Sequence, residues 1–258
     1  MLVLFSFFKN WRRSRILAKP FPQRLEQFIV DNVWQYRFLT EPQQARVRQC
    51  ARVMSAEKSW EGIDGLAIND EIKLTISATA GLLTLGLKEP FYFDRVRTVI
   101  VYPGLIKNRQ MTRGMLVSDE EAYYSGLAWQ GGPLVFSWSN SLRGSQRSGD
   151  GANVVIHEFI HHIDGLDGEM GGTPLIASEE LRERWETVFQ SRYRELVEDL
   201  EERRRPRLDE YAATNMAEFF AVAGESFFDS PHRLQRDLPD VYELFKDYFK
   251  IEPTEFDI

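Results

Sequence analysis

The pattern of apolar and polar positions divides the chain into a helical first part, a short β-rich middle and a helical last part. Between residues 22 and 58, apolar side chains such as Leu25, Phe28 and Ile29 lie three or four positions apart, which predicts amphipathic helices. Near residue 96 the pattern changes to short β-branched runs bounded by Gly or Pro, which indicates strands. Helices are expected at 43–54, 71–85, 153–164, 178–205, within 209–228 and at 238–249, and strands at 96–102, 114–118 and 134–138.

This order of elements predicts an α+β fold, in which a small mixed sheet is covered by helices. We expect a single domain over residues 21–258 with an N-terminal helical part, preceded by an extension, residues 1–20, that has no clear place. A loop over 144–151 is expected to join the strand at 134–138 to the apolar helix at 153–164. Three arginines of the N-terminal helices, Arg46, Arg48 and Arg52, are expected to face solvent.

Composition narrows the class of protein. The chain has 258 residues, of which 43% are hydrophobic, so it can bury a sizeable core. Its net charge of −7 disfavours nucleic acid or an anionic membrane as the default partner. Cys50 is the only cysteine, which excludes an internal disulfide and a cysteine-type zinc site. The apolar start, Met1–Phe8, is too short to span a bilayer, and we expect a cytoplasmic protein without stable membrane insertion. An amphipathic surface contact through Leu4, Phe7, Phe8 and Trp11 with the basic cluster is the alternative to a flexible or core-docked terminus, which is favoured.

Three of the four histidines lie together on the helix at 153–164. His157 and His161 are four residues apart, so on a helix their rings project from one face and can meet at one metal ion. Glu158 is the neighbour of the first ligand and can act as general base toward a metal-activated water. His162 points away from this pair and is expected not to be a ligand. Without a metal, the same spacing would only place two partly exposed histidines on an amphipathic helix.

A third ligand for zinc is expected from another apolar helix further along the chain. Glu218 follows Met216 and precedes Phe219 and Phe220, an unusual environment for a solvated carboxylate. It also stands three residues after Asn215, so its side chain could instead complete a helix cap. Metal ligation is favoured, because a buried acid without a countercharge is costly.

Two further acids and a glycine-rich segment surround these residues in the sequence. Asp164 is on the ligand face, where it can accept a hydrogen bond from a ligand imidazole or simply end the helix before Gly165. Glu225 follows Glu218 by two helical turns and can orient the site from behind or form a polar edge of its helix. The run 165–174 is rich in glycine and is expected to form a mobile loop beside the site.

The segments His157–His161, 164–168 and 211–223, together with 97–104 and 132–138, resemble the Mlc titration factor A family of zinc metallopeptidases. More remotely, they resemble the catalytic domain of lethal-factor toxins. The resemblance implies a zincin-like fold of the gluzincin type, with zinc on His157, His161 and Glu218. It also implies Glu158 as the base and Tyr211 as a hydrogen-bond donor near the oxyanion. It further suggests that the strand at 134–138 is an edge strand that binds an extended peptide.

The function expected from these residues is zinc-dependent hydrolysis of peptide bonds, aminopeptidase-like by the resemblance. The alternative, also implied by the resemblance, is a regulatory protein that binds and sequesters a transcriptional repressor of sugar uptake, with the zinc site secondary. A metal-free structural domain is the third possibility. The sequence leaves open the natural substrate and the assembly state.

Overall fold

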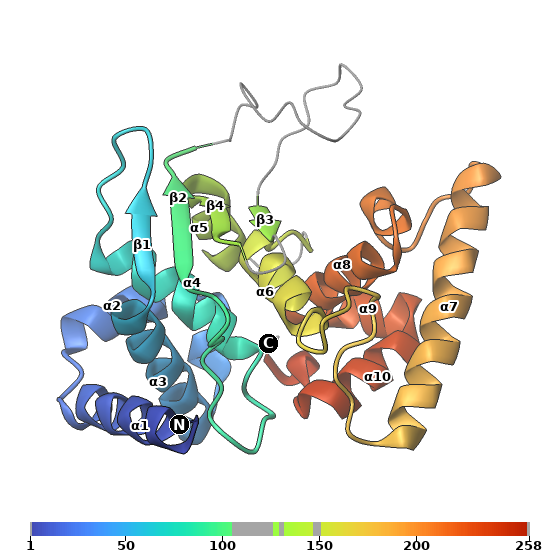
Figure 1. Cartoon of the computed structure of the whole chain (residues 1–258). Coiled ribbons are helices and arrows are strands. Elements are labelled where there is room, and N and C mark those ends of the chain that lie inside the picture. Colours follow the sequence, from blue (N-terminus) through green and yellow to red (C-terminus); the bar gives the residue numbers. More distant parts are fainter. Residues whose placement is uncertain (1, 105–125, 129–131, 147–150, 257–258) are drawn as a thin grey trace.

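The structure is a computed structural model that describes residues 2–104, 126–128, 132–146 and 151–256. A small sheet stands at the centre, with the N-terminal helices on one side and the C-terminal helices on the other (Figure 1). The strand at 114–118 that the sequence suggested lies outside the described residues. The helices are α1 (Leu2–Ala18), α2 (Gln23–Asn32), α3 (Glu41–Glu57), α4 (Asp70–Leu82), α5 (Trp138–Gln146), α6 (Val154–Asp164), α7 (Glu179–Glu201), α8 (Met216–Asp229), α9 (Pro231–Asp237) and α10 (Pro239–Phe249), with 3₁₀ turns η1 (Trp34–Phe38), η2 (Glu210–Ala213) and η3 (Pro253–Phe256).

The sheet has four strands among the described residues, in the order β1-β2-β4-β3. The strands are β1 (Ser59–Gly62), β2 (Thr98–Tyr102), β3 (Gly126–Ala128) and β4 (Leu134–Ser137). β1, β2 and β4 are parallel to one another, and β3 is antiparallel to β4. The prediction that 134–138 forms an edge strand is therefore wrong, because β4 is hydrogen-bonded on both sides. The strand that covers its outer side has only three residues, and its Gly-Leu-Ala sequence carries no β pattern.

Two other local predictions need correction. The segment expected to be a loop at 144–151 begins inside α5, which continues directly from β4 to Gln146. The arginines expected in solvent are half-buried and bonded within the N-terminal helices. Arg48 contacts Glu26 at 3.0 Å, and Arg52 donates a hydrogen bond of 2.6 Å to the backbone carbonyl of Ile16. Arg46 donates a hydrogen bond of 3.2 Å to the carbonyl of Thr84, at the end of α4.

Helix α1 is joined to the rest of the molecule by buried charge. Arg13 is only 8% exposed and forms ion pairs with Glu57 at the end of α3, at 2.7 Å, and with Asp94. Its guanidinium also lies 4.6 Å from the ring centre of Tyr92. The N-terminal segment, which the sequence did not place, is therefore docked against α3 and the segment after α4. No helix within the described part of the chain is both long and apolar enough to cross a membrane.

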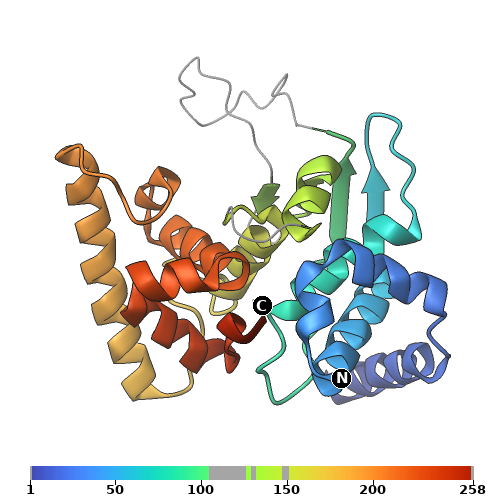
Figure 2. The same ribbon diagram turned by 180° about the vertical axis from the view of Figure 1, so that it is seen from behind.

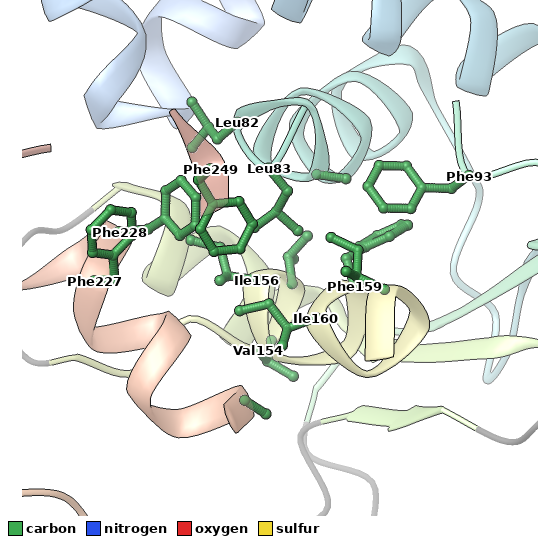
Figure 3. Close-up of a cluster of buried hydrophobic side chains, with 14 of the residues drawn as sticks. Leu82, Leu83, Phe93, Val154, Ile156, Phe159, Ile160, Phe227, Phe228 and Phe249 are labelled. Atoms are coloured by element: carbon green, nitrogen blue, oxygen red, sulfur yellow. The ribbon is translucent and has the colours of Figure 1, made fainter. Parts of the chain in front are cut away.

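Helix α6 occupies the middle of the hydrophobic core (Figure 3). Ile156, Phe159 and Ile160 are fully buried between α4 on one side and α8 on the other. α6 and α8 approach closely at Gly224, where an added Cβ would lie 2.1 Å from a methyl carbon of Ile160. A second layer of aromatic rings then fixes α8 against α7 and α10, with Trp185 stacked on Phe189 at 4.4 Å. From behind, α7, α9 and α10 are seen to surround α8, which contacts all three of them (Figure 2).

Candidate metal centre

Helix α6 carries the two histidines and starts at a buried cap. The side chain of Asn153 accepts a hydrogen bond from the backbone amide of Ile156 at 3.2 Å, which satisfies one of the unpaired amides of the first turn. The amide of Asn153 itself donates to Glu225 at 2.7 Å, and its side-chain amide donates to the carbonyl of Gly144 at 3.1 Å. The start of the helix is thereby fixed to both α5 and α8.

Helix α8 presents Glu218 in its first turn. Asn215 caps this helix by accepting a hydrogen bond of 3.0 Å from the backbone amide of Glu218. The carboxylate of Glu218 is directed instead at the two imidazoles, so the cap and the carboxylate use different atoms of one residue. The competition between capping and ligation that the sequence suggested is therefore absent.

Three possible ligand atoms form a nearly equilateral triangle. The Nε2 atoms of His157 and His161 are 3.1 Å apart, and Oε2 of Glu218 lies 3.1 Å from the first and 3.2 Å from the second. Bonds of about 2.0–2.1 Å at tetrahedral angles separate ligand atoms by about 3.3–3.4 Å, so the observed triangle is close to the size that zinc requires. In the described part of the chain, this is the one group of three or more His, Cys, Asp or Glu residues arranged to hold a metal ion.

Glu225 holds His157 from the side opposite to the triangle. Its Oε1 lies 2.6 Å from Nδ1 of His157, and its Oε2 accepts from the amide of Asn153. A proton on Nδ1 leaves the lone pair of Nε2 directed at the triangle, which is the tautomer that a metal ligand needs. Burial opposes charge on this ring, but the Glu225 carboxylate and hydrogen bonds to Glu218 and Glu225 outweigh it and raise the pKa of His157 to about 10. The Glu218 and Glu225 carboxylates thus favour a positive charge at His157.

Two carboxyl groups of the site, those of Glu158 and Glu218, have pKa values shifted in opposite directions. Burial raises the pKa of Glu158 to about 8, with Glu218 and Glu225 acting in the same direction against His157. Glu218 is less buried, and hydrogen bonds from the two histidines outweigh burial and lower its pKa to about 2. Burial thus favours the protonated form of Glu158, whereas the two histidines favour the ionised form of Glu218. Enzymes that use two carboxyl groups in different roles show the same contrast: the carboxylate with the lowered pKa stabilises a positive charge, and the group with the raised pKa transfers protons.

The remaining polar residues of α6 do not point into the triangle. His162 packs beside Phe93, with ring centres 5.9 Å apart, and burial lowers its pKa to about 4, helped by the charges of Lys58 and Arg95. Asp164 is fully buried and accepts a hydrogen bond of 3.0 Å from the amide of Gly172. Its other oxygen, like Nδ1 of His161, has no hydrogen-bond partner among the described residues. Of the two acids considered for orienting a ligand, Glu225 is the one whose side chain contacts an imidazole.

The glycine-rich loop between α6 and α7 is anchored at Gly172. The amide of this residue donates to Asp164, and its carbonyl accepts from Trp185 of α7 at 2.9 Å. Its φ of +77° favours glycine, and an added Cβ would lie 2.4 Å from the carbonyl oxygen of Met216. Gly172 therefore joins the end of the histidine helix to the start of the helix that carries Glu218. The sequence marked the loop as glycine-rich but gave no signal for which glycine makes this contact.

Replacement of Gly172 by alanine is expected to separate these two helix ends. We predict that the free energy of unfolding falls by about 1–3 kcal/mol, because the backbone strain and the contact with Met216 must both be relieved. Gly171→Ala is the matched control, since nothing lies within 4 Å of its added Cβ and its φ is outside the positive range. Equal urea midpoints for the two variants would contradict this role of Gly172.

Tyr211 lies at the border of the site. It belongs to η2, and its ring centre is 6.0 Å from that of His157. Tyr211 is 52% exposed, so it lies at the surface rather than in the core. Asp209 fixes the turn by accepting a hydrogen bond of 2.9 Å from the amide of Tyr211. Residue 211 precedes α8, as expected, and belongs to a separate short turn.

Comparisons with known proteins agree with this arrangement. The model of a family described as glucose-regulated metallo-peptidase M90 matches residues 8–250. An uncharacterized protein of Synechocystis sp., slr2042, is 32% identical over 247 residues, which cover 95% of this chain and 90% of the relative. Mlc titration factor A of Yersinia pestis is 29% identical over 83% of this chain and 80% of its own length. The protein of that name from Escherichia coli is 26% identical over 84% of this chain and 82% of its own length.

Proposed function

The chain belongs to the family of glucose-regulated metallo-peptidases M90, and we propose that it is a zinc-dependent peptidase. The observation that supports this proposal best is the triangle formed by two imidazole nitrogens and one carboxylate oxygen, all 3.1–3.2 Å apart. Two neutral imidazoles and a glutamate are the ligands of one class of catalytic zinc sites, which leave a position for water. The residues therefore fit zinc in number, in type and in spacing.

In the proposed mechanism, zinc is held by His157, His161 and Glu218, and when bound it lowers the pKa of a water molecule and polarises the substrate carbonyl. Glu158 accepts the proton of the attacking water and returns it to the leaving amine as the peptide bond breaks. Glu158 follows the ligand His157 directly in the sequence, and burial raises the pKa of its carboxyl group, which favours exchange of a proton with water. Tyr211 donates a hydrogen bond to the oxyanion of the tetrahedral intermediate, and Glu225 keeps His157 in the required tautomer.

We further propose a zincin-like fold of the gluzincin type and an aminopeptidase-like preference for peptide ends. The second point is tested with two sets of peptides of the same sequence, one with a free N-terminus and one acetylated. An aminopeptidase cleaves only the first set and releases single residues in order. Equal cleavage of both sets at internal bonds would show an endopeptidase instead.

Removal of the metal is expected to abolish hydrolysis reversibly. Dialysis against a chelator should remove one zinc ion per chain together with peptidase activity, and addition of one equivalent of zinc should restore both. The thermal unfolding temperature should also rise on zinc addition, because a ligand that binds only the folded state stabilises it. Full activity after verified removal of all metal would exclude the mechanism.

A second candidate function rests on the names of the relatives. Two relatives at 26% and 29% identity are called Mlc titration factor A, which indicates that those proteins titrate a regulator. By this proposal the chain binds a transcriptional regulator, with catalysis as a separate activity. Co-purification with a regulator that persists in Glu158→Gln would support separate functions, whereas loss of binding with the zinc ion would link them.

A further inference from the structure

One face of α1 combines exposed aromatic and basic side chains. Phe8 is 60% exposed and Trp11 is 52% exposed, and Arg12 and Arg15 on the same helix are also exposed. Trp11 and Arg12 each lie three or four positions from both Phe8 and Arg15, so the four residues form a single stripe along the helix. The guanidinium of Arg15 lies 4.8 Å from the ring centre of Trp11, which makes the aromatic and basic parts of the stripe continuous.

The opposite face of α1 fixes the direction of this stripe. Arg13 pairs with Glu57 and Asp94, and Lys9 pairs with Asp94 at 2.6 Å. Because Arg13 is 8% exposed, this side of the helix is turned toward the protein. Phe8, Trp11 and Arg15 therefore face outward, and the exposed Arg12 lies at the border of the stripe, where its guanidinium donates a hydrogen bond of 3.4 Å to the carbonyl of Ala56.

The charge of this segment is opposite to that of the rest of the chain. The first 25 residues contain six Lys and Arg and no Asp or Glu, whereas the remaining chain contains 26 Lys and Arg against 39 Asp and Glu. The positive potential is thus concentrated on one small part of an otherwise acidic protein. Such a segment attracts an anionic surface, while the acidic remainder is repelled from it.

The apolar residues distinguish a bilayer from other anionic partners. The sequence of α1 begins Leu-Val-Leu-Phe-Ser-Phe-Phe and turns basic from Lys9 onward. Helices that lie in a membrane interface combine Trp, Phe and Leu with Lys and Arg in this manner. A nucleic acid would attract the arginines, whereas the aliphatic residues that precede them in the sequence match the apolar part of a lipid layer. The helix is too short and too charged to span a membrane, as the described residues show.

We propose that α1 is a peripheral membrane-binding helix that recognises anionic phospholipids. Phe8 and Trp11 insert at the level of the headgroups, and Arg12 and Arg15 bind lipid phosphates. The ion pairs of Arg13 keep the body of the protein attached to the inner face of the helix during this contact. The inference is independent of the catalytic proposal, because it uses no residue of the metal centre.

The test is co-sedimentation of the full chain with vesicles of phosphatidylcholine alone or mixed with phosphatidylglycerol. We expect binding only to the mixed vesicles, decreasing as salt is added. Arg12→Glu with Arg15→Glu should lower the partition coefficient roughly 30-fold or more, since each basic residue near the surface contributes about a factor of five. Phe8→Ser with Trp11→Ser should also lower it at unchanged net charge.

The matched control is Arg203→Glu with Arg205→Glu, which changes the net charge equally at two exposed positions far along the sequence. It should bind as the unchanged protein does. Circular dichroism verifies that all variants are folded. The proposal is overturned if the unchanged chain ignores anionic vesicles, if the control loses as much binding as the α1 variants, or if Trp11 instead mediates dimerisation in sedimentation experiments without vesicle binding.

Discussion

Glu158→Gln is expected to lower the turnover of peptide hydrolysis by about 10²–10⁴-fold while leaving the zinc content unchanged. Glutamine has nearly the same shape but cannot accept a proton from water. Glu158 is 3% exposed and contributes none of the three atoms of the triangle. The substitution therefore removes the proposed base and none of the proposed ligands. The measurement is kcat on a peptide substrate together with zinc per chain by elemental analysis.

The control for this variant is Glu169→Gln, which removes a carboxylate from the exposed loop after α6. It should retain full turnover. Activity of Glu158→Gln equal to that of this control would eliminate Glu158 as the base. Loss of zinc from Glu158→Gln would show that the residue acts through the structure of the site instead.

Glu218→Ala is expected to have the second large effect, a loss of zinc affinity well above about 100-fold. It removes one of the three proposed ligands and leaves the Nε2 atoms of His157 and His161, 3.1 Å apart, without the carboxylate that contacts both of them. Glu225→Gln provides the graded comparison, because it alters only the hydrogen bond to His157 and should cost about 10–100-fold in affinity. The measurement is competition for zinc against a chromophoric chelator.

The order of these two losses distinguishes the residue that binds zinc from the residue that orients His157. If Glu225→Gln weakened zinc more than Glu218→Ala, Glu225 would be the ligand and Glu218 the orienting residue. Folding is verified for both variants by circular dichroism, because Glu225 also accepts the hydrogen bond from Asn153 at the start of α6.

The grouping of His157, His161 and Glu218 could be predicted from the sequence because it depends on local chemistry. The four-residue spacing of His157 and His161 fixes their common face on any helix. The apolar surroundings of Glu218 marked a carboxylate that needs a positive partner, and the structure places it 3.1 Å from His157. Both statements depend on helical periodicity and on the cost of burying charge, which a single sequence reveals.

The sheet was harder to predict, because strand order depends on contacts between distant segments. β3 consists of three residues and β1 of four, and their sequences carry little β signal. Their pairing with β4 and β2 decides which strand is interior, so the edge role predicted for 134–138 failed. Likewise, the half-buried Arg48 appears as an ordinary surface residue until Glu26 and Tyr36 are placed beside it.

The hydrogen bonds that surround the proposed ligands could be predicted only in part from the sequence. Helical spacing placed Glu225 on the face of Glu218, but it could not show that one oxygen reaches His157 and the other reaches the amide of Asn153. The anchoring of Gly172 by Asp164 and Trp185 joins three elements and has no local signature. Such contacts depend on tertiary packing that a single sequence does not specify.

X-ray absorption at the zinc edge of the purified protein shows directly whether His157, His161 and Glu218 hold a zinc ion. We expect one zinc ion per chain with two imidazole nitrogens and oxygen ligands at about 2.0–2.1 Å, and a loss of this signal in Glu218→Ala. A protein that contains no stoichiometric metal, or one whose zinc has fewer than two imidazole ligands, would contradict it.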